Sequence, residues 1–141
     1  MPEPAASPRQ LVTDFYNALS AADTETIVRT VESRFAENAA IEWPPSLPHG
    51  GRVEGARRVR AVFAASANPD APAGAKNLRL VSAIGEGDEV VAWITFDWLQ
   101  PGSAAPVANQ ALELWRFSDG LVQEIRAFYW DSDAISAPQP A

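Results

Sequence analysis

The stretch that decides the fold is residues 107–130, VANQALELWRFSDGLVQEIRAFYW, in which two runs of alternating apolar and polar residues flank a short polar turn. Alternation with a period of two predicts a half-buried β-strand on each side of the turn. The turn, Ser118-Asp119-Gly120, contains a glycine that can adopt the positive φ that a tight hairpin requires. The sequence therefore predicts an antiparallel hairpin of residues 107–117 and 121–130.

The residues before this hairpin predict two more strands. Residues 78–84 alternate in polarity, the run Gly85-Glu86-Gly87-Asp88 forms a turn, and residues 89–99 alternate again. A Pro-Gly-Ser loop at residues 101–103 then leads into the hairpin. The second half of the chain is therefore expected to form four consecutive antiparallel strands.

The first half of the chain has helical periodicity instead. Residues 8–22 carry apolar side chains at helical spacing, and a second helix, capped by Asp23, is predicted to reach about residue 35. A short strand at residues 39–43 ends at two prolines, and a Pro- and Gly-rich loop follows as far as residue 51. A third helix is predicted to begin near Gly55.

Helices that precede a group of strands indicate an α+β fold in which the helices cover one face of a sheet. The length of 141 residues fits one domain, which we expect to span residues 9–133. Residues 1–8 and 134–141 are rich in Pro, Ala and Ser and are expected to be flexible tails.

Composition excludes several classes of function. The net charge of −7 argues against nucleic acid and against an anionic membrane surface as partners. The chain has no cysteine, which excludes disulfides and thiolate zinc sites, and we expect no metal and no cofactor. The first residues lack the pattern of a secretory signal and no apolar run is long enough to span a membrane, so a cytoplasmic location is expected.

Four segments of the chain resemble the NTF2-like superfamily, and within it the SnoaL-like polyketide cyclases and ketosteroid isomerases. They are residues 15–23, residues 35–44, residues 55–63 and, most characteristically, the hairpin from residue 113 to residue 130. The resemblance implies a cone-shaped fold, with a curved antiparallel or mixed sheet wrapped by three N-terminal helices around a pocket. It also implies a homodimer formed through the outer face of the sheet, where Trp93 and Leu114 would point.

The resemblance also implies which strand residues point into the pocket, and many of them are aromatic. An aromatic pocket of this kind suits a long conjugated or polycyclic apolar molecule, which we expect as the substrate. The residues expected to bind it are Trp43, Phe15, Ile94, Phe96, Trp98, Asn109, Trp115, Tyr129 and the loop residue His49.

Comparison with the steroid isomerases suggests the catalytic groups. Steroid isomerases use a carboxylate base, a helix tyrosine and a strand aspartate. This chain has Trp43, Phe15 and Glu113, respectively, at those positions, so the base and the phenol are expected to be missing. Glu113 is then the main catalytic candidate, because a carboxyl group kept neutral in an apolar cavity can donate a hydrogen bond. Asp14 could reach the pocket from the first helix, and Asn38 and Asn109 could complete a polar cluster there. Asp14 nevertheless fits an exposed helix residue better, and Asn38 fits the end of the second helix better.

These observations predict a cofactor-independent enzyme, a cyclase that closes a ring in a hydrophobic polyketide or polyene. Catalysis would rest on holding the substrate in a reactive conformation and on hydrogen bonding, as in a cycloaddition. A non-catalytic module that binds a small molecule or a protein is the alternative. Isomerase or epoxide hydrolase activity is less well supported by the residues present.

Overall fold

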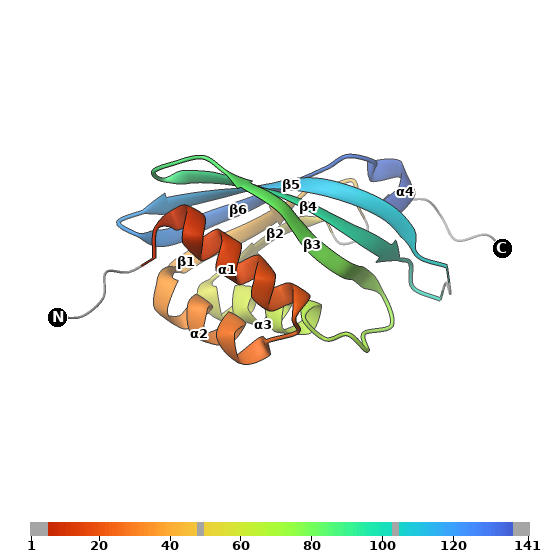
Figure 1. Cartoon of the computed structure of the whole chain (residues 1–141). Coiled ribbons are helices and arrows are strands. Elements are labelled where there is room, and N and C mark those ends of the chain that lie inside the picture. The colour runs from red at the N-terminus through yellow and green to blue at the C-terminus, as the bar shows by residue number, and fades with distance from the viewer. Residues whose placement is uncertain (1–5, 48–49, 103–104, 137–141) are drawn as a thin grey trace.

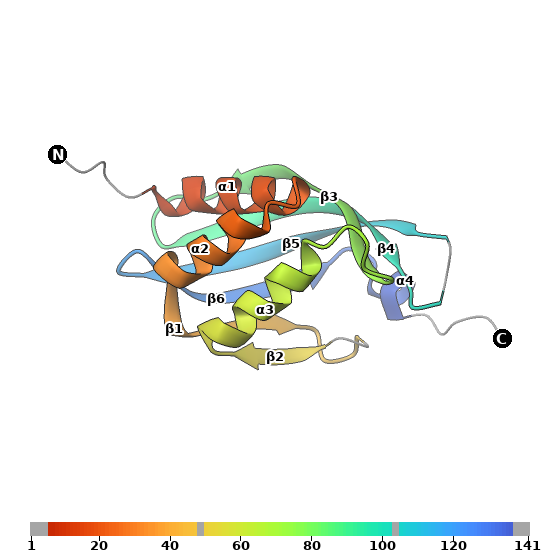
Figure 2. The ribbon, with the colours of Figure 1, turned by 90° about the horizontal axis from the view of Figure 1, so that it is seen from below.

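The computed structural model of the chain describes residues 6–47, 50–102 and 105–136. Six strands form one mixed, curved sheet in the order β2-β1-β6-β5-β4-β3 (Figure 1). The strands are β1 (Phe35–Trp43), β2 (Gly51–Glu54), β3 (Gly74–Ile84), β4 (Glu89–Leu99), β5 (Val107–Ser118) and β6 (Leu121–Tyr129). The helices are α1 (Pro8–Ser20), α2 (Thr24–Arg34), α3 (Ala56–Ser66) and α4 (Ser132–Ser136). The first three helices lie together on one face of the sheet (Figures 1 and 2), which confirms the predicted α+β architecture.

The hairpin predicted from residues 107–130 is present as β5 and β6. Asp119 and Gly120 at its tip both have positive φ, 52° and 79°, as a tight turn requires. β3, β4, β5 and β6 are consecutive antiparallel neighbours, while β1 pairs with β6 in parallel. The sheet is therefore mixed, with β1 and β6 as its parallel pair.

The two N-terminal helices begin at capping side chains. Ser7 accepts a hydrogen bond from the backbone N–H of Gln10, and Asp23 accepts one from that of Thr26, as predicted for the second helix. α2 ends at Arg34, so the expectation that Asn38 ends this helix is wrong. Phe35 is already extended, and Asn38 lies within β1.

Four elements differ from the sequence prediction. β1 begins at Phe35 instead of residue 39. The sequence predicts a loop as far as residue 51 and no strand before α3, but residues 51–54 form β2 and pair antiparallel with β1. β3 starts at residue 74 instead of residue 78, because its first residues pair with the end of β4. α4 includes residues that the sequence assigns to a tail, and its Ile135 is fully buried.

The core fills the space between the three helices and the concave face of the sheet. Its centre is a cluster of aromatic rings, in which the Phe15 ring centroid lies 4.7 Å from that of Phe63 and 5.2 Å from that of Trp115. Both pairs meet edge to face, a geometry that contributes about 0.5–1.5 kcal/mol per pair beyond the burial of area. No helix in the described part of the chain is long and apolar enough to cross a membrane.

The outer face of the sheet has an apolar part and a charged part. Trp93, Leu112 and Phe128 are direct neighbours across β4, β5 and β6, and they are 38%, 46% and 52% exposed. We call these three residues the outer apolar row. The outward direction of Trp93 agrees with the sequence prediction.

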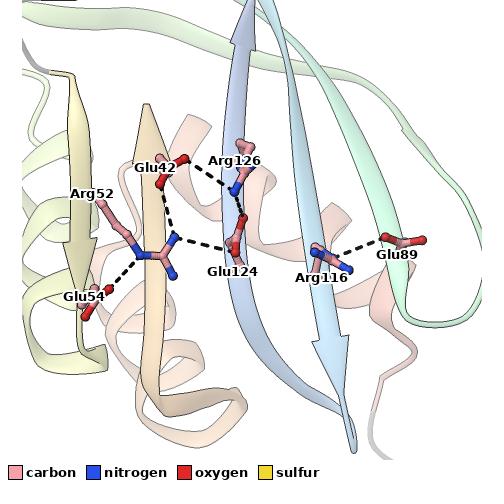
Figure 3. A network of polar contacts seen from close by, with 7 residues as sticks. All are labelled: Glu42, Arg52, Glu54, Glu89, Arg116, Glu124 and Arg126. Carbon is pink, nitrogen blue, oxygen red and sulfur yellow. Dashed lines mark hydrogen bonds and ion pairs between the residues drawn. The ribbon is translucent and has the colours of Figure 1, made fainter. Parts of the chain in front are cut away.

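The charged part lies on β2, β1 and β6 (Figure 3). Arg126 bonds Glu124 at 3.0 Å and Glu42 at 3.5 Å, and Arg52 reaches Glu54 at 2.8 Å. Glu124 and Arg126 therefore form a surface pair that belongs to a larger network of charges. Each such pair contributes little to stability on its own, because its charges are screened by water.

Candidate active site

A pocket of about 450 Å³ opens between the helices and the concave face of the sheet. Most of its wall is apolar, and the residues that line it come from α1, α3 and every strand of the sheet. They are Tyr16, Leu19, Trp43, Val53, Val62, Phe63, Ser66, Gly74, Ala75, Leu78, Ile94, Phe96, Trp98, Glu113 and Tyr129. The volume lies in the range of small-molecule sites.

One acidic group, Glu113 of β5, interrupts the apolar wall. The Tyr16 hydroxyl of α1 donates a hydrogen bond to Glu113 Oε1. The Tyr16 oxygen in turn accepts a hydrogen bond from Nε1 of Trp115, at 3.0 Å. Side chains from two elements far apart in sequence, α1 and β5, thus form a continuous chain of hydrogen bonds that runs from Trp115 through Tyr16 to Glu113.

The directions of these bonds follow from what each group can do. An indole N–H only donates, so the Tyr16 oxygen must be the acceptor of the Trp115 bond. The Tyr16 hydroxyl proton is then directed to Glu113 Oε1. Within the described residues no further group bonds Glu113, which leaves its second oxygen, Oε2, available to a ligand in the pocket.

The apolar surroundings change the acidity of all three titratable groups at this end of the pocket. Burial raises the pKa of Glu113, and the hydrogen bond from Tyr16 opposes that rise. Burial, and then the charge of Glu113, raise the pKa of Tyr16 well above its usual value. The same two causes raise the pKa of Tyr129. The site therefore favours a neutral carboxyl group and neutral phenols.

Six of the residues predicted for the site line the pocket. Glu113 and Trp43 are among them, and the other four are Ile94, Phe96, Trp98 and Tyr129. Phe15 and Trp115 belong instead to the fully buried core behind the wall, at 1% and 0% exposure. Trp115 nevertheless reaches the site through its bond to Tyr16.

Three other predicted residues lie elsewhere. Asp14 is exposed on α1, where it accepts a hydrogen bond from Gln10 at 2.8 Å, because it points away from the buried face of the helix. Asn38 is exposed on β1, in the irregular part of its pairing with β6.

Asn109 points toward the concave side of β5 but does not line the pocket. It bonds the backbone of Asp131 on both sides, donating to its carbonyl at 2.9 Å and accepting from its N–H at 3.3 Å. Its side chain therefore fixes the connection between β6 and α4 instead of facing the pocket. His49 lies outside the described residues.

Tyr16 is the site residue that sequence reasoning missed. The expectation that the phenol is absent from the pocket is wrong, because Tyr16, and not Phe15, turns its side chain to Glu113. The available signal was the width of the buried face of α1, which includes both residues. The wall residues from α3 and β3 were likewise not singled out.

Comparison with protein families gives a match. Residues 12–125 match the family model described as "SnoaL-like domain". No protein among those with curated descriptions matches significantly.

Three solved structures of similar fold are 18–20% identical to this chain in sequence. An NTF2-like protein from Burkholderia thailandensis E264 superimposes with a TM-score of 0.75 at 20% identity, over 96% of this chain and 100% of that one. A protein named "Putative SnoaL-like polyketide cyclase" from Jannaschia sp. CCS1 has a TM-score of 0.67 at 20% identity, over 99% of both chains. A hypothetical protein with a ketosteroid isomerase-like fold from Catenulispora acidiphila DSM 44928, in complex with trimethylamine, has a TM-score of 0.66 at 18% identity, over 95% and 96%. At these identities the likeness shows the NTF2-like fold.

Proposed function

The chain belongs to the SnoaL-like domain family, and we propose that it is a cyclase that closes a ring in an apolar, carbonyl-containing substrate of the polyketide type. The observation that carries the proposal is the acidic group of Glu113 within an otherwise apolar pocket, bonded to Tyr16 and left with one free oxygen. A similar protein of this fold named as a polyketide cyclase supports the same class of reaction.

The apolar wall would supply the first part of catalysis. Aromatic side chains such as Trp43, Trp98 and Phe96 line the pocket and would hold an extended, conjugated chain by contact area. A flexible substrate confined in this way loses the conformations that cannot react, so part of the entropic cost of ring closure is met on binding.

Glu113 would supply the second part. In its neutral form the carboxyl group donates from Oε2 to a carbonyl oxygen of the substrate, and the bond from Tyr16 to Oε1 makes that donor stronger. The polarised carbonyl withdraws electrons from the double bond conjugated to it. In a cycloaddition that bond reacts with a diene of the same molecule, the new bonds form from the substrate's own π electrons, and no group leaves.

The test uses a linear ketone that carries a conjugated diene at one end and an enone at the other, called here the diene–enone probe. Its closure leaves the mass unchanged and removes the diene absorbance. We expect the protein to accelerate closure, and Glu113→Leu to lower the rate by about tenfold, which corresponds to one net hydrogen bond of roughly 1.4 kcal/mol. Glu113→Gln keeps a weaker donor and should lie between the two.

Asp14→Asn removes an exposed carboxylate on α1 and serves as the matched control, with an unchanged rate expected. Equal rates for the wild type and a folded Glu113→Leu variant would contradict the role of Glu113. Tight binding of the probe without any conversion would instead favour the alternative, a non-catalytic binding module.

We also propose that the protein acts as a homodimer joined through the outer apolar row. Three large apolar side chains in register on one sheet face are unusual for a surface in water, and the adjacent charges are already paired with one another. Leu112→Asp should shift the sedimentation coefficient from dimer to monomer, whereas Arg58→Glu on the exposed side of α3 should not. A monomeric wild type at micromolar concentration would refute this proposal.

A further inference from the structure

Trp115 lies behind the pocket and does not touch its space, yet it is bonded to the site. It follows Glu113 by two residues on β5, so both side chains point to the concave face of the sheet. Its indole is completely buried, and its ring centroid lies 5.8 Å from that of Tyr16 at an interplanar angle of 68°. Its Nε1 donates to the Tyr16 oxygen at 3.0 Å.

We propose that Trp115 is a positioning residue, whose N–H orients the Tyr16 hydroxyl toward Glu113 Oε1 and thereby assigns the carboxyl proton of Glu113 to Oε2, where the substrate binds. This inference rests on the proposed function in one respect only, namely that the substrate accepts a hydrogen bond from Glu113. The orientation itself is a property of the free protein.

Trp115 can orient the Tyr16 proton because each of the three hydrogen-bonded side chains has a limited set of donors and acceptors. When Trp115 donates to the Tyr16 oxygen, the geometry around that oxygen favours a hydroxyl proton on the opposite side, toward Glu113. An Oε1 that accepts this proton acts as the carbonyl oxygen of the neutral acid, so the acid proton resides on Oε2. Aligned donors also polarise one another, which strengthens the final bond to the substrate.

Without the indole N–H, the Tyr16 hydroxyl is free to rotate. It could then accept the carboxyl proton from Glu113, and the acid would point its proton at Tyr16 instead of at the substrate. Trp115 therefore determines which of two hydrogen-bond arrangements the site adopts, although it lies outside the pocket.

The arrangement also affects the acidity of Glu113. Among the described residues, the titratable groups that face Glu113 are Tyr16 from α1 and Tyr129 from β6. Its neighbours in the pairing of β5, Ala92 and Ala127, carry no charge. Of these contacts, the Tyr16 hydrogen bond lowers the pKa of Glu113 against the effect of burial. A Tyr16 hydroxyl that is no longer held toward Glu113 should lower it less.

The first experiment is the titration of Glu113 in the full chain, followed by NMR of the carboxyl carbon after labelling with [13C]glutamate. We expect Trp115→Phe to raise the midpoint by about half a pH unit, a threefold change in proton affinity. Phe117→Leu is the matched control. It removes another buried ring on the same face of β5, one that stacks on Trp115, and it leaves the groups that bond Tyr16 and Glu113 unchanged. It should leave the midpoint unchanged.

If Trp115→Phe does not fold, Tyr16→Phe tests the bond that Trp115 is proposed to orient, since it removes the bond to Glu113 while keeping the ring. It should raise the midpoint at least as far, and Trp115→Phe added to Tyr16→Phe should raise it no further. An unchanged midpoint in a folded Trp115→Phe or Tyr16→Phe variant overturns the proposal.

The second experiment measures closure of the diene–enone probe. Because Trp115 does not contact the pocket, Trp115→Phe should lower kcat several-fold and leave KM unchanged. An increase in KM with kcat unchanged would show that Trp115 only packs against the site, and would overturn the positioning role. A wild type that fails to convert the probe, together with a midpoint that moves as expected, would refute the proposed function and leave the orienting role of Trp115 intact.

Discussion

Removal of the Tyr16 hydroxyl should destabilise the protein, and the loss should depend on whether Trp115 is present. Tyr16→Phe keeps the ring and its contacts but deletes the acceptor of Trp115 Nε1 and the donor to Glu113. Tyr16 and Trp115 are both completely buried, so water cannot replace the missing partner of the indole. A double-mutant cycle over these two residues separates the hydrogen bond from the packing.

The expected magnitudes follow from the number of groups left without a partner. The stranded indole N–H costs about 1–3 kcal/mol, and the lost bond to Glu113 adds about 1 kcal/mol, since Glu113 faces the pocket and can bind water there. Tyr16→Phe should therefore lower the free energy of unfolding by roughly 2–4 kcal/mol. A domain of this size has about 5–15 kcal/mol in total, so the variant should still fold.

The double variant, in which Trp115 is also Phe, has no stranded N–H. Its loss should be smaller than the sum of the two single losses by about 1 kcal/mol. The assay is urea unfolding followed by far-ultraviolet circular dichroism, because the Trp115 variants change the fluorescence. Losses that add to within about 0.5 kcal/mol would show that the two side chains are not coupled, and would refute the hydrogen-bond chain described above.

Three further predictions concern other parts of the molecule. Burial raises the pKa of Glu113 in the folded state. The contribution of this carboxyl group to stability is therefore fully present below its unfolded-state pKa near 4.5, and it is lost as the pH rises through the folded-state pKa. Unfolding midpoints measured between acidic and neutral pH should show this decline, and Glu113→Gln should remove it. Asn109→Ala should lower the free energy of unfolding by about 1–3 kcal/mol, because both backbone bonds to Asp131 are lost. Hydrogen exchange should become faster in α4 and, within β5, at Gln110, whose N–H also bonds Asn109. Val62→Trp fills the pocket from α3 and should abolish calorimetric binding of the diene–enone probe while the circular dichroism spectrum stays unchanged; binding at wild-type affinity would show that the probe occupies another site.

Much of the sheet could be predicted from the sequence because its signals are local. The period-two alternation in residues 107–130 and the glycine at the turn depend only on neighbouring residues, and both strands formed where expected. The parity of β5 followed from the family resemblance, and it placed Glu113 on the concave side correctly. β2 is not predicted because its four residues are too short a run to show a clear alternation of polarity. Only their pairing with β1 makes them a strand.

The pocket could be predicted less completely, for a reason that α1 illustrates. Phe15 and Tyr16 are adjacent and both buried, and a helix rotates by about 100° between neighbours, so one meets the core and the other the pocket. The helical period gives the buried face, but the angle at which α1 crosses the sheet decides which residue reaches Glu113. That angle depends on contacts between segments about a hundred residues apart. Asn38 was misassigned for a related reason, since its strand is defined by pairing with β6.

Trp115, Tyr16 and Glu113 must therefore satisfy the stability of the core and the chemistry of the site at once. A chain of polar groups inside an aromatic core is tolerated only when each member has its partner, since a partly satisfied network costs more than an apolar one. Trp115, Tyr16 and Glu113 meet this condition while leaving one oxygen of Glu113 for the pocket. A loss of turnover in a variant of Tyr16 or Trp115 is consequently ambiguous, because destabilisation would produce it too. The titration midpoint of Glu113 resolves the ambiguity, since it responds to the direction of the Tyr16 proton and not to the stability of the fold.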